Sequence, residues 1–153
     1  MRGIRASFWI SLAFISLFSA SAATPAQAQV GKGLQGGVSL DPDQVFFGGH
    51  VETSPLVDRL RFRPNVDIGL GDNLTSVGFN FDFTYAFTAA RPWSLYAGAG
   101  PSINWYDFDG GSQTEGGFNF IIGAKQREGM FFEMRIGMAD SPDLKFGVGY
   151  TFR

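Results

Sequence analysis

The segment from Val77 to Phe87 constrains the fold of this chain more than any other. Every second residue in it is large and apolar, and the residues between them are small or polar. The small or polar residues are Gly78, Asn80, Asp82, Thr84 and Ala86. A period of two over this length is typical of a β-strand whose two faces meet different surroundings.

The same alternation continues along the chain, and no window past residue 28 has helical periodicity. Short segments rich in Asp, Asn, Gly and Pro interrupt it and favour turns. The pattern predicts strands at 30–40, 44–53, 59–70, 74–88, 93–105, 117–125, 129–138 and 143–152. Connections this short join neighbouring antiparallel strands, so we predict an all-β chain folded as an eight-stranded up-and-down barrel. The segment from Asp107 to Gly116 is predicted to be the one long loop, and the only one long enough to recognise a partner.

The width of such a barrel decides which face of each strand points outward. The interior of an eight-stranded barrel is just wide enough for side chains to fill it, so Phe79, Phe81 and Phe83 cannot all point inward. Only 17% of the residues are charged, against about 25% in typical soluble domains. We therefore predict a transmembrane barrel with an apolar outer face and a polar lumen.

Two sets of residues follow from this orientation. The predicted lipid-facing residues are Phe79, Phe81, Phe83, Tyr85, Phe120, Phe132, Phe146 and Val148. Aromatic residues near strand ends are predicted to form girdles at the edges of the hydrocarbon layer. They are Trp93, Trp105, Tyr106, Tyr150 and Phe152.

Residues 1–28 have the pattern of a cleavable signal peptide. Arg2 and Arg5 precede an uncharged, mostly apolar run, and Ala26-Gln27-Ala28 fits the small-x-small rule for cleavage after Ala28. Ser21-Ala22-Ala23 is a second choice. The alternative of a membrane anchor is disfavoured because ~15 apolar residues fall short of the ~20 that span a bilayer. The barrel domain is then 29–153, and the signal together with the absence of Cys indicates a bacterial envelope protein.

The last predicted strand carries a more specific pattern. Leu144-x-Phe146-x-Val148-x-Tyr150-x-Phe152 resembles the C-terminal strand of the small outer-membrane β-barrel proteins of Gram-negative-type bacteria, the OmpA/OmpX-type barrels. The resemblance covers residues 30–153, with one departure, because Arg153 follows the aromatic residue on which the family usually ends.

That resemblance implies a location and partners. It implies export through the periplasm, recognition of the last strand by the barrel-assembly machinery, and a monomer in contact with outer-membrane lipid and lipopolysaccharide. It also places both termini in the periplasm, so that the turns after the first, third, fifth and seventh strands lie outside the cell.

The charges would then be divided between the two ends of the barrel. The acidic residues of the outer end are Asp41, Asp43, Asp72, Asp107, Asp109, Glu115, Asp140 and Asp143, and the basic residues of the periplasmic end are Arg91, Lys125, Arg127 and Arg153. Asp is common in turns, and this is the favoured explanation. The alternative is a carboxylate rim that holds divalent cations or attracts cations, although no spacing matches a calcium loop and no metal site is predicted.

Polar residues at inward positions predict a salt-bridged lumen. A tight hairpin between the second and third strands would set Glu52 opposite Arg59 and His50 opposite Arg61. The Asp72-Asn73 turn would likewise set Arg63 opposite Asp82, and the interior continues with Glu133, Arg135 and Lys145. Charges in a low-dielectric lumen need partners, so we predict a closed plug; the alternative is a narrow, gated ion path.

No catalytic site or cofactor is predicted. The only His is His50, with Glu52 and Ser54 on the same face of its strand, and it would point into the lumen. The outer-membrane barrels that hydrolyse or transfer lipid acyl groups use residues facing the lipid instead. The stretch from Gly31 to Gly36 matches a dinucleotide fingerprint but has no strand before it and no helix after it.

Three functions remain. The net charge of −2 leaves no polybasic surface for nucleic acid. A structural or surface-interaction barrel is favoured, a narrow pore is the alternative, and a soluble secreted barrel that binds an apolar ligand is disfavoured by the lipid-facing surface.

Overall fold

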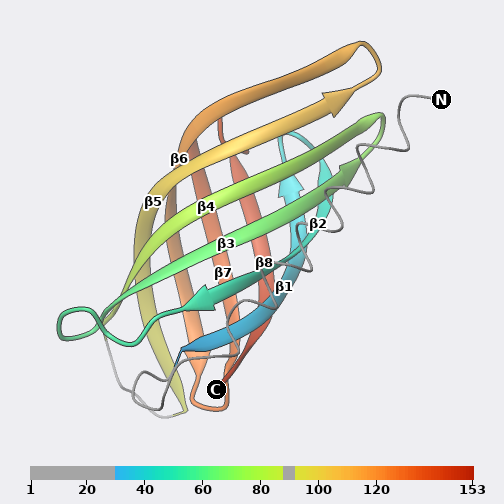
Figure 1. Ribbon diagram of the computed structural model, residues 1–153. Helices are drawn as coiled ribbons and strands as arrows, with labels where there is room; N and C mark the ends of the chain where they lie inside the picture. Colours follow the sequence, from blue (N-terminus) through green and yellow to red (C-terminus); the bar gives the residue numbers. More distant parts are fainter. Residues whose placement is uncertain (1–29, 88–91) are drawn as a thin grey trace, which may run out of the picture.

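The computed structural model describes residues 30–87 and 92–153, which form a closed antiparallel β-barrel of eight strands (Figure 1). Each strand pairs with its neighbours in sequence, and β1 pairs with β8 to close the barrel. The predicted all-β, up-and-down architecture is thereby confirmed. The strands are β1 (Gly31–Leu40), β2 (Gln44–Glu52), β3 (Leu60–Gly71), β4 (Leu74–Ala86), β5 (Trp93–Phe108), β6 (Gly111–Gln126), β7 (Met130–Ala139) and β8 (Leu144–Phe152).

Two predictions fall outside the described residues. The signal peptide at 1–28 is one, and the position of Arg91 is the other. Within residues 30–87 and 92–153, no helix is long and apolar enough to cross a membrane.

The barrel has two unlike ends. At the termini end, β1 begins, β8 ends, and the connections β2–β3, β4–β5 and β6–β7 turn. At the distal end, the chain turns between β1 and β2, β3 and β4, β5 and β6, and β7 and β8. The eight acidic residues predicted for the outer end lie at or near the distal end, whereas Lys125, Arg127 and Arg153 lie at the termini end, together with the acidic Asp58 and Glu128.

The hairpin of β5 and β6 corrects the predicted loop. Asp107 pairs with Ser112 and Phe108 with Gly111, so only Asp109 and Gly110 remain in the turn. Residues 111–114 are exposed, and no buried face imposes an apolar residue at every second position, so the alternation that marks the other strands is missing. The hairpin extends beyond the other strands at the distal end (Figure 1).

The connection between β2 and β3 corrects the predicted register. His50 pairs with Asn65 rather than with Arg61, because residues 53–59 form a longer connection than a tight hairpin. Within it, Asp58 has a left-handed backbone and Val57 forms an isolated bridge with Leu60. The register differs from the predicted one by an even number of residues, which leaves each side chain on its predicted face of the sheet.

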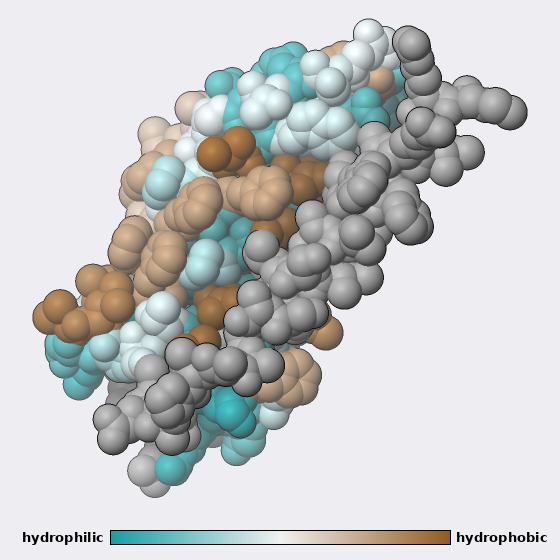
Figure 2. All heavy atoms as spheres, viewed as in Figure 1, coloured by the Kyte–Doolittle hydropathy of each residue, from teal (hydrophilic) through white to brown (hydrophobic). Residues whose placement is uncertain are grey.

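The two faces of β4 separate as the alternation indicates. Phe79, Phe81 and Phe83 are 43%, 39% and 44% exposed on the outer face, whereas Asn80 and Asp82 are buried inside. Tyr85, Phe120, Phe132, Phe146 and Val148 are also exposed. Apolar side chains form a band across the middle of the visible wall in Figure 2, with hydrophilic residues gathered above it.

The predicted girdle residues do not all share one face. At the termini end, the Trp93 ring lies 5.7 Å from that of Phe132, and Tyr150 packs on Phe152 at 4.9 Å. The prediction that Tyr106 belongs to the outer girdle is wrong. Tyr106 lies on the same inward face of β5 as Asn104, and its hydroxyl donates to the Asp140 carbonyl oxygen at 3.2 Å across the distal mouth.

Candidate functional site: the charged interior

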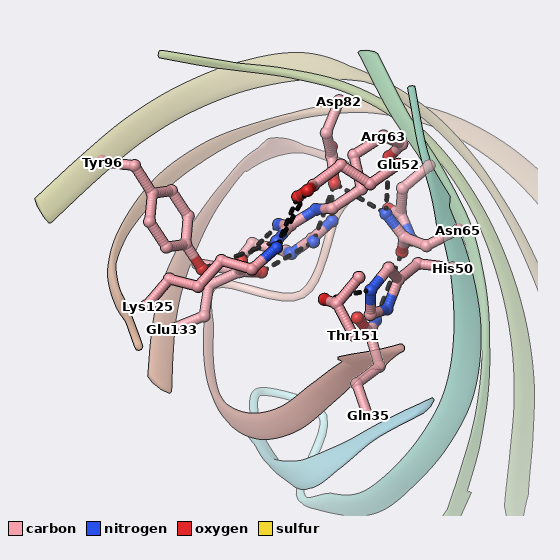
Figure 3. Close-up of polar contacts among 12 residues, drawn as sticks. Gln35, His50, Glu52, Arg63, Asn65, Asp82, Tyr96, Lys125, Glu133 and Thr151 are labelled. Carbon is pink, nitrogen blue, oxygen red and sulfur yellow. Dashed lines mark hydrogen bonds and ion pairs between the residues drawn. The ribbon is translucent and has the colours of Figure 1, made fainter. Parts of the chain in front are cut away.

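Four charged side chains meet inside the lumen and form what we call the central cluster: Arg63, Asp82, Glu133 and Arg135. Arg135 Nη2 donates to Asp82 Oδ2 at 2.8 Å and to Glu133 Oε1 at 2.9 Å. Arg63 Nη2 donates to the other oxygen of Glu133. Because β3 and β4 lie across the barrel from β7, these ion pairs bridge opposite walls (Figure 3).

Neutral donors complete the central cluster. The Tyr96 hydroxyl donates to Glu133 Oε2 at 2.8 Å, and Asn65 Nδ2 donates to Asp82 Oδ2 at 2.7 Å. The guanidinium of Arg63 also lies 5.5 Å from the Tyr96 ring centre. Each buried carboxylate therefore has both a cation and a neutral hydrogen-bond donor, as buried charges require.

The predicted pairing of Arg63 needs a correction of partner. Arg63 lies directly opposite Asp82 in the β3–β4 register, but its ion pair is with Glu133. The ion-pair partner of Asp82 is Arg135. Both partners come from β7, which is remote from β3 and β4 in the sequence and adjacent to them only across the lumen.

Polar contacts continue from the central cluster toward the distal end. Asp67 accepts a hydrogen bond from Gln35 Nε2 at 2.7 Å and lies 3.5 Å from Lys145 Nζ. The ammonium of Lys145 is 4.8 Å from the Phe46 ring centre. Closer to the distal mouth, the hydroxyls of Ser102 and Ser141 are hydrogen-bonded at 2.7 Å.

His50 lies in the lumen on the termini side of these contacts. Its Nε2 is 3.0 Å from Thr151 Oγ1, and its ring meets the edge of Phe131 at 5.3 Å between centres. A side chain at Gly33 would collide with the imidazole, so this glycine permits the close approach of β1. In the described residues His50 has no hydrogen bond to Ser54, so the two form no nucleophile and base pair.

At the termini end of the lumen, the Glu52 carboxylate is the acceptor for several cationic side chains. Lys125 Nζ and Arg153 Nη2 each lie 2.8 Å from its carboxylate, and Arg61 Nη1 lies 3.7 Å away. Arg59 does not join them, contrary to the predicted Glu52 and Arg59 pair. Its guanidinium is exposed and donates to the Phe87 carbonyl oxygen at 3.0 Å, because the longer β2–β3 connection carries it to the rim.

The lumen widens beside Glu52 into a cavity of about 330 Å³, which we call the basic vestibule. Six of its lining side chains are cationic and one is anionic. The lining residues are Glu52, Arg59, Arg61, Arg63, Thr84, Ala86, Pro92, Ser94, Tyr96, Lys125, Gln126, Arg127 and Arg153. Arg63 forms part of both the vestibule and the central cluster.

The centre of the barrel has almost no free space. The cavity beside Glu133 and Arg135 measures about 10 Å³, which is close to the smallest volume that can hold one water molecule. Large side chains fill the interior at this level. The buried ones are Phe46, Tyr96, Ile121 and Phe131.

These four residues were not among the predicted lumen residues. A signal for three of them was present, because Phe46, Ile121 and Phe131 stand in consecutive apolar runs. The runs are Val45-Phe46-Phe47, Phe120-Ile121-Ile122 and Met130-Phe131-Phe132. In a strand, consecutive apolar residues put apolar side chains on both faces. The interior is therefore a mixed layer of ion pairs and aromatic packing rather than a polar lumen alone.

The acidic distal rim contains no preformed metal site in the described residues. No three Asp, Glu or His side chains there are close enough together to hold an ion. The residues at that rim instead surround a shallow depression lined by Asp41, Tyr106, Glu115 and Asp140 among others.

The fold and the interior define a small closed β-barrel with ion pairs across its lumen. Its structure is similar to the N-terminal β-barrel domain of Pseudomonas aeruginosa OprF, with a TM-score of 0.63 and 19% identity over 82% of this chain and 100% of that one. It is also similar to Neisserial surface protein A (NspA), with a TM-score of 0.59 and 16% identity over 83% of this chain and 100% of that one.

No protein-family model matches the sequence, and no curated protein is significantly similar to it. The structural similarities establish the fold, which is that of the OmpA/OmpX-type eight-stranded barrels.

Proposed function

We propose that this protein is an integral outer-membrane barrel with a closed interior and a structural or surface-interaction role. The observation that carries the proposal is the combination of an apolar outer wall with a lumen blocked by ion pairs. Neither half is sufficient alone, because a soluble barrel can have a charged core and a pore can have an apolar exterior.

The outer wall supports insertion in a bilayer. Large apolar side chains on all eight strands are exposed, among them Leu34 on β1, Phe81 on β4 and Phe146 on β8. A soluble barrel would leave this surface in contact with water, which is unfavourable by about 25 cal/mol for each Å². The two similar structures are barrels of outer-membrane proteins, which favours the same location.

The central cluster supports closure. Arg63, Asp82, Glu133 and Arg135 are each bonded across the lumen. The cavity beside Glu133 and Arg135 measures only about 10 Å³. An ion passing this level would have to separate buried ion pairs, which costs several kcal/mol for each unpaired charge. The narrow pore is therefore the less favoured function.

Further parts of the proposal follow from the sequence. Residues 1–28 act as the export signal, the last strand is recognised by the barrel-assembly machinery, and the mature barrel is a monomer in contact with lipid and lipopolysaccharide. The termini end then faces the periplasm, and the acidic distal end faces the outside.

The β5–β6 hairpin supports the surface-interaction role. Pairing between β6 and β7 begins at Gly117 and Ala139, so residues 111–116 of β6 have no partner on that side within the described chain. An unpaired edge can bind another strand by main-chain hydrogen bonds. Shortening the hairpin by removing residues 107–112 should weaken binding to surface partners and leave the barrel folded.

Fractionation and conductance test the main proposal. We expect the protein in the outer-membrane fraction, with a gel mobility that changes on heating, and no steady conductance steps in a planar bilayer. Recovery of a soluble protein would contradict the membrane assignment. Stable single-channel steps would contradict closure and favour the pore.

A further inference from the structure

The basic vestibule has more cationic groups than its own carboxylates can neutralise. Glu52 is the one acidic residue among its described lining residues, and Lys125, Arg153 and Arg61 already surround it. No ion pair is found in the described chain for Arg59 or Arg127. In the central cluster, by contrast, two arginines meet two carboxylates.

One buried donor on a residue that lines the vestibule is also unsatisfied. Arg63 is fully buried, and its Nη atoms contact Glu133 and Tyr96, but its Nε has no hydrogen-bond partner in the described residues. Buried side-chain donors nearly always have a partner, and an unpaired one indicates a bound group or solvent. Here the residue that carries the unpaired donor also lines the cavity.

We propose that the basic vestibule binds a phosphate-bearing anion. Guanidinium groups present planar pairs of donors that match phosphate oxygens, and five of the six cations that line the vestibule are arginines. The volume of about 330 Å³ suits a small ligand such as a diphosphate or a phosphorylated lipid headgroup. Arg59, Arg61 and Arg127 at the rim would contact the anion first, with Arg63 beneath it.

The site differs from the rest of the charged interior in its access. Arg61 is 27% exposed, and Arg59 and Arg127 are exposed, so an anion can reach them without disturbing the central cluster. The proposal goes beyond the proposed function, because a closed structural barrel needs no ligand. It holds whichever side of the membrane the termini end faces.

The experiment is a titration of the folded full-length mature barrel with inorganic pyrophosphate, in an uncharged, phosphate-free detergent. We expect saturable binding to wild type. Arg61→Gln and Arg127→Gln should each weaken it about tenfold, because each removes a charge-assisted hydrogen bond. Lys32→Gln is the matched control, since Lys32 lies at the same end but does not line the vestibule, and its binding should equal that of wild type.

A second arm distinguishes the two sources of phosphate. The barrel is placed in vesicles with or without phosphatidic acid in a phosphatidylcholine background, and pyrophosphate is titrated again. Competition by phosphatidic acid assigns the site to a lipid headgroup, and its absence assigns the site to a soluble phosphate compound.

The proposal is overturned by either of two results. One is that pyrophosphate does not bind wild-type barrel whose heat-dependent gel mobility shows it is folded. The other is that Lys32→Gln weakens binding as much as Arg61→Gln, since binding would then reflect overall charge. The mobility measurement alone tests the barrel fold, so failure of the vestibule site is distinguishable from failure of the membrane assignment.

Discussion

Arginine side chains lie in both the central cluster and the basic vestibule, but their surroundings differ between the two regions. In the central cluster Arg135 is buried and bonded to Asp82 and Glu133. In the vestibule Arg61 is partly exposed and lies 3.7 Å from a carboxylate that two other cations already contact. The comparison teaches that the surroundings, rather than the residue type, decide whether an arginine holds the barrel together or remains available to a ligand.

Removing a carboxylate from the central cluster should give the largest effect. Asp82→Ala leaves Arg135 with one partner in a buried site, and we expect the free energy of unfolding to fall by about 3–5 kcal/mol. Urea unfolding of the barrel in lipid vesicles measures it.

Two double variants test whether the loss belongs to the cluster. Asp82→Ala with Arg135→Met removes both members of the pair and should recover most of the stability. Asp82→Ala with Arg61→Met removes an equal charge from the vestibule and should recover none. Equal recovery by both would mean that overall charge, and not the buried pair, governs stability.

A charge introduced on the outer wall extends the comparison to a third environment. Phe81→Arg should destabilise the barrel by about 2–4 kcal/mol if position 81 lies near the bilayer midplane. Phe152→Arg, at the termini end, should cost about 0–1 kcal/mol because the headgroup region solvates the guanidinium. The same unfolding measurement applies, and equal small losses at both positions would argue against a surrounding bilayer.

Removing a charge from the vestibule should change stability least. Arg61→Gln should alter the free energy of unfolding by less than about 1 kcal/mol, because the side chain is partly solvated and its ion pair is long. A loss as large as that of Asp82→Ala would show that the vestibule is structural, and the contrast between the two regions would fail.

Salt should separate the two regions without any substitution. Raising the salt concentration from low to physiological shortens the screening length to about 8 Å and should weaken pyrophosphate binding in the exposed vestibule. The unfolding midpoint should hardly move, because the buried pairs of the central cluster are shielded from mobile ions. Isothermal titration and urea unfolding in the same buffers provide both measurements.

The sequence by itself determined that the chain forms eight strands, the order of these strands and the face on which most side chains lie. Alternation from Val77 to Phe87 required one apolar and one polar face, and barrel width required the apolar face to be outside. These properties depend on neighbours within a strand or on the next strand. The sequence of a single segment and its turns is therefore enough to predict these properties.

Other features were missed because the local pattern was weak or ambiguous. The β5–β6 hairpin beyond Trp105 lacks alternation, since both its faces are exposed. The length of the β2–β3 connection depended on Asp58 and the Val57 bridge, and no composition rule sets these. The inward parity of Tyr106 follows once β5 is seen to continue past residue 105.

Only the tertiary structure decided which charges meet. Arg63 lies opposite Asp82 along the sheet, yet it pairs with Glu133 across the lumen, and Asp82 pairs with Arg135. Long side chains in a narrow barrel reach the opposite wall as readily as the neighbouring strand. The stagger and tilt of all eight strands set the level at which opposite walls face one another, so this pairing is a property of the closed barrel and of no single segment.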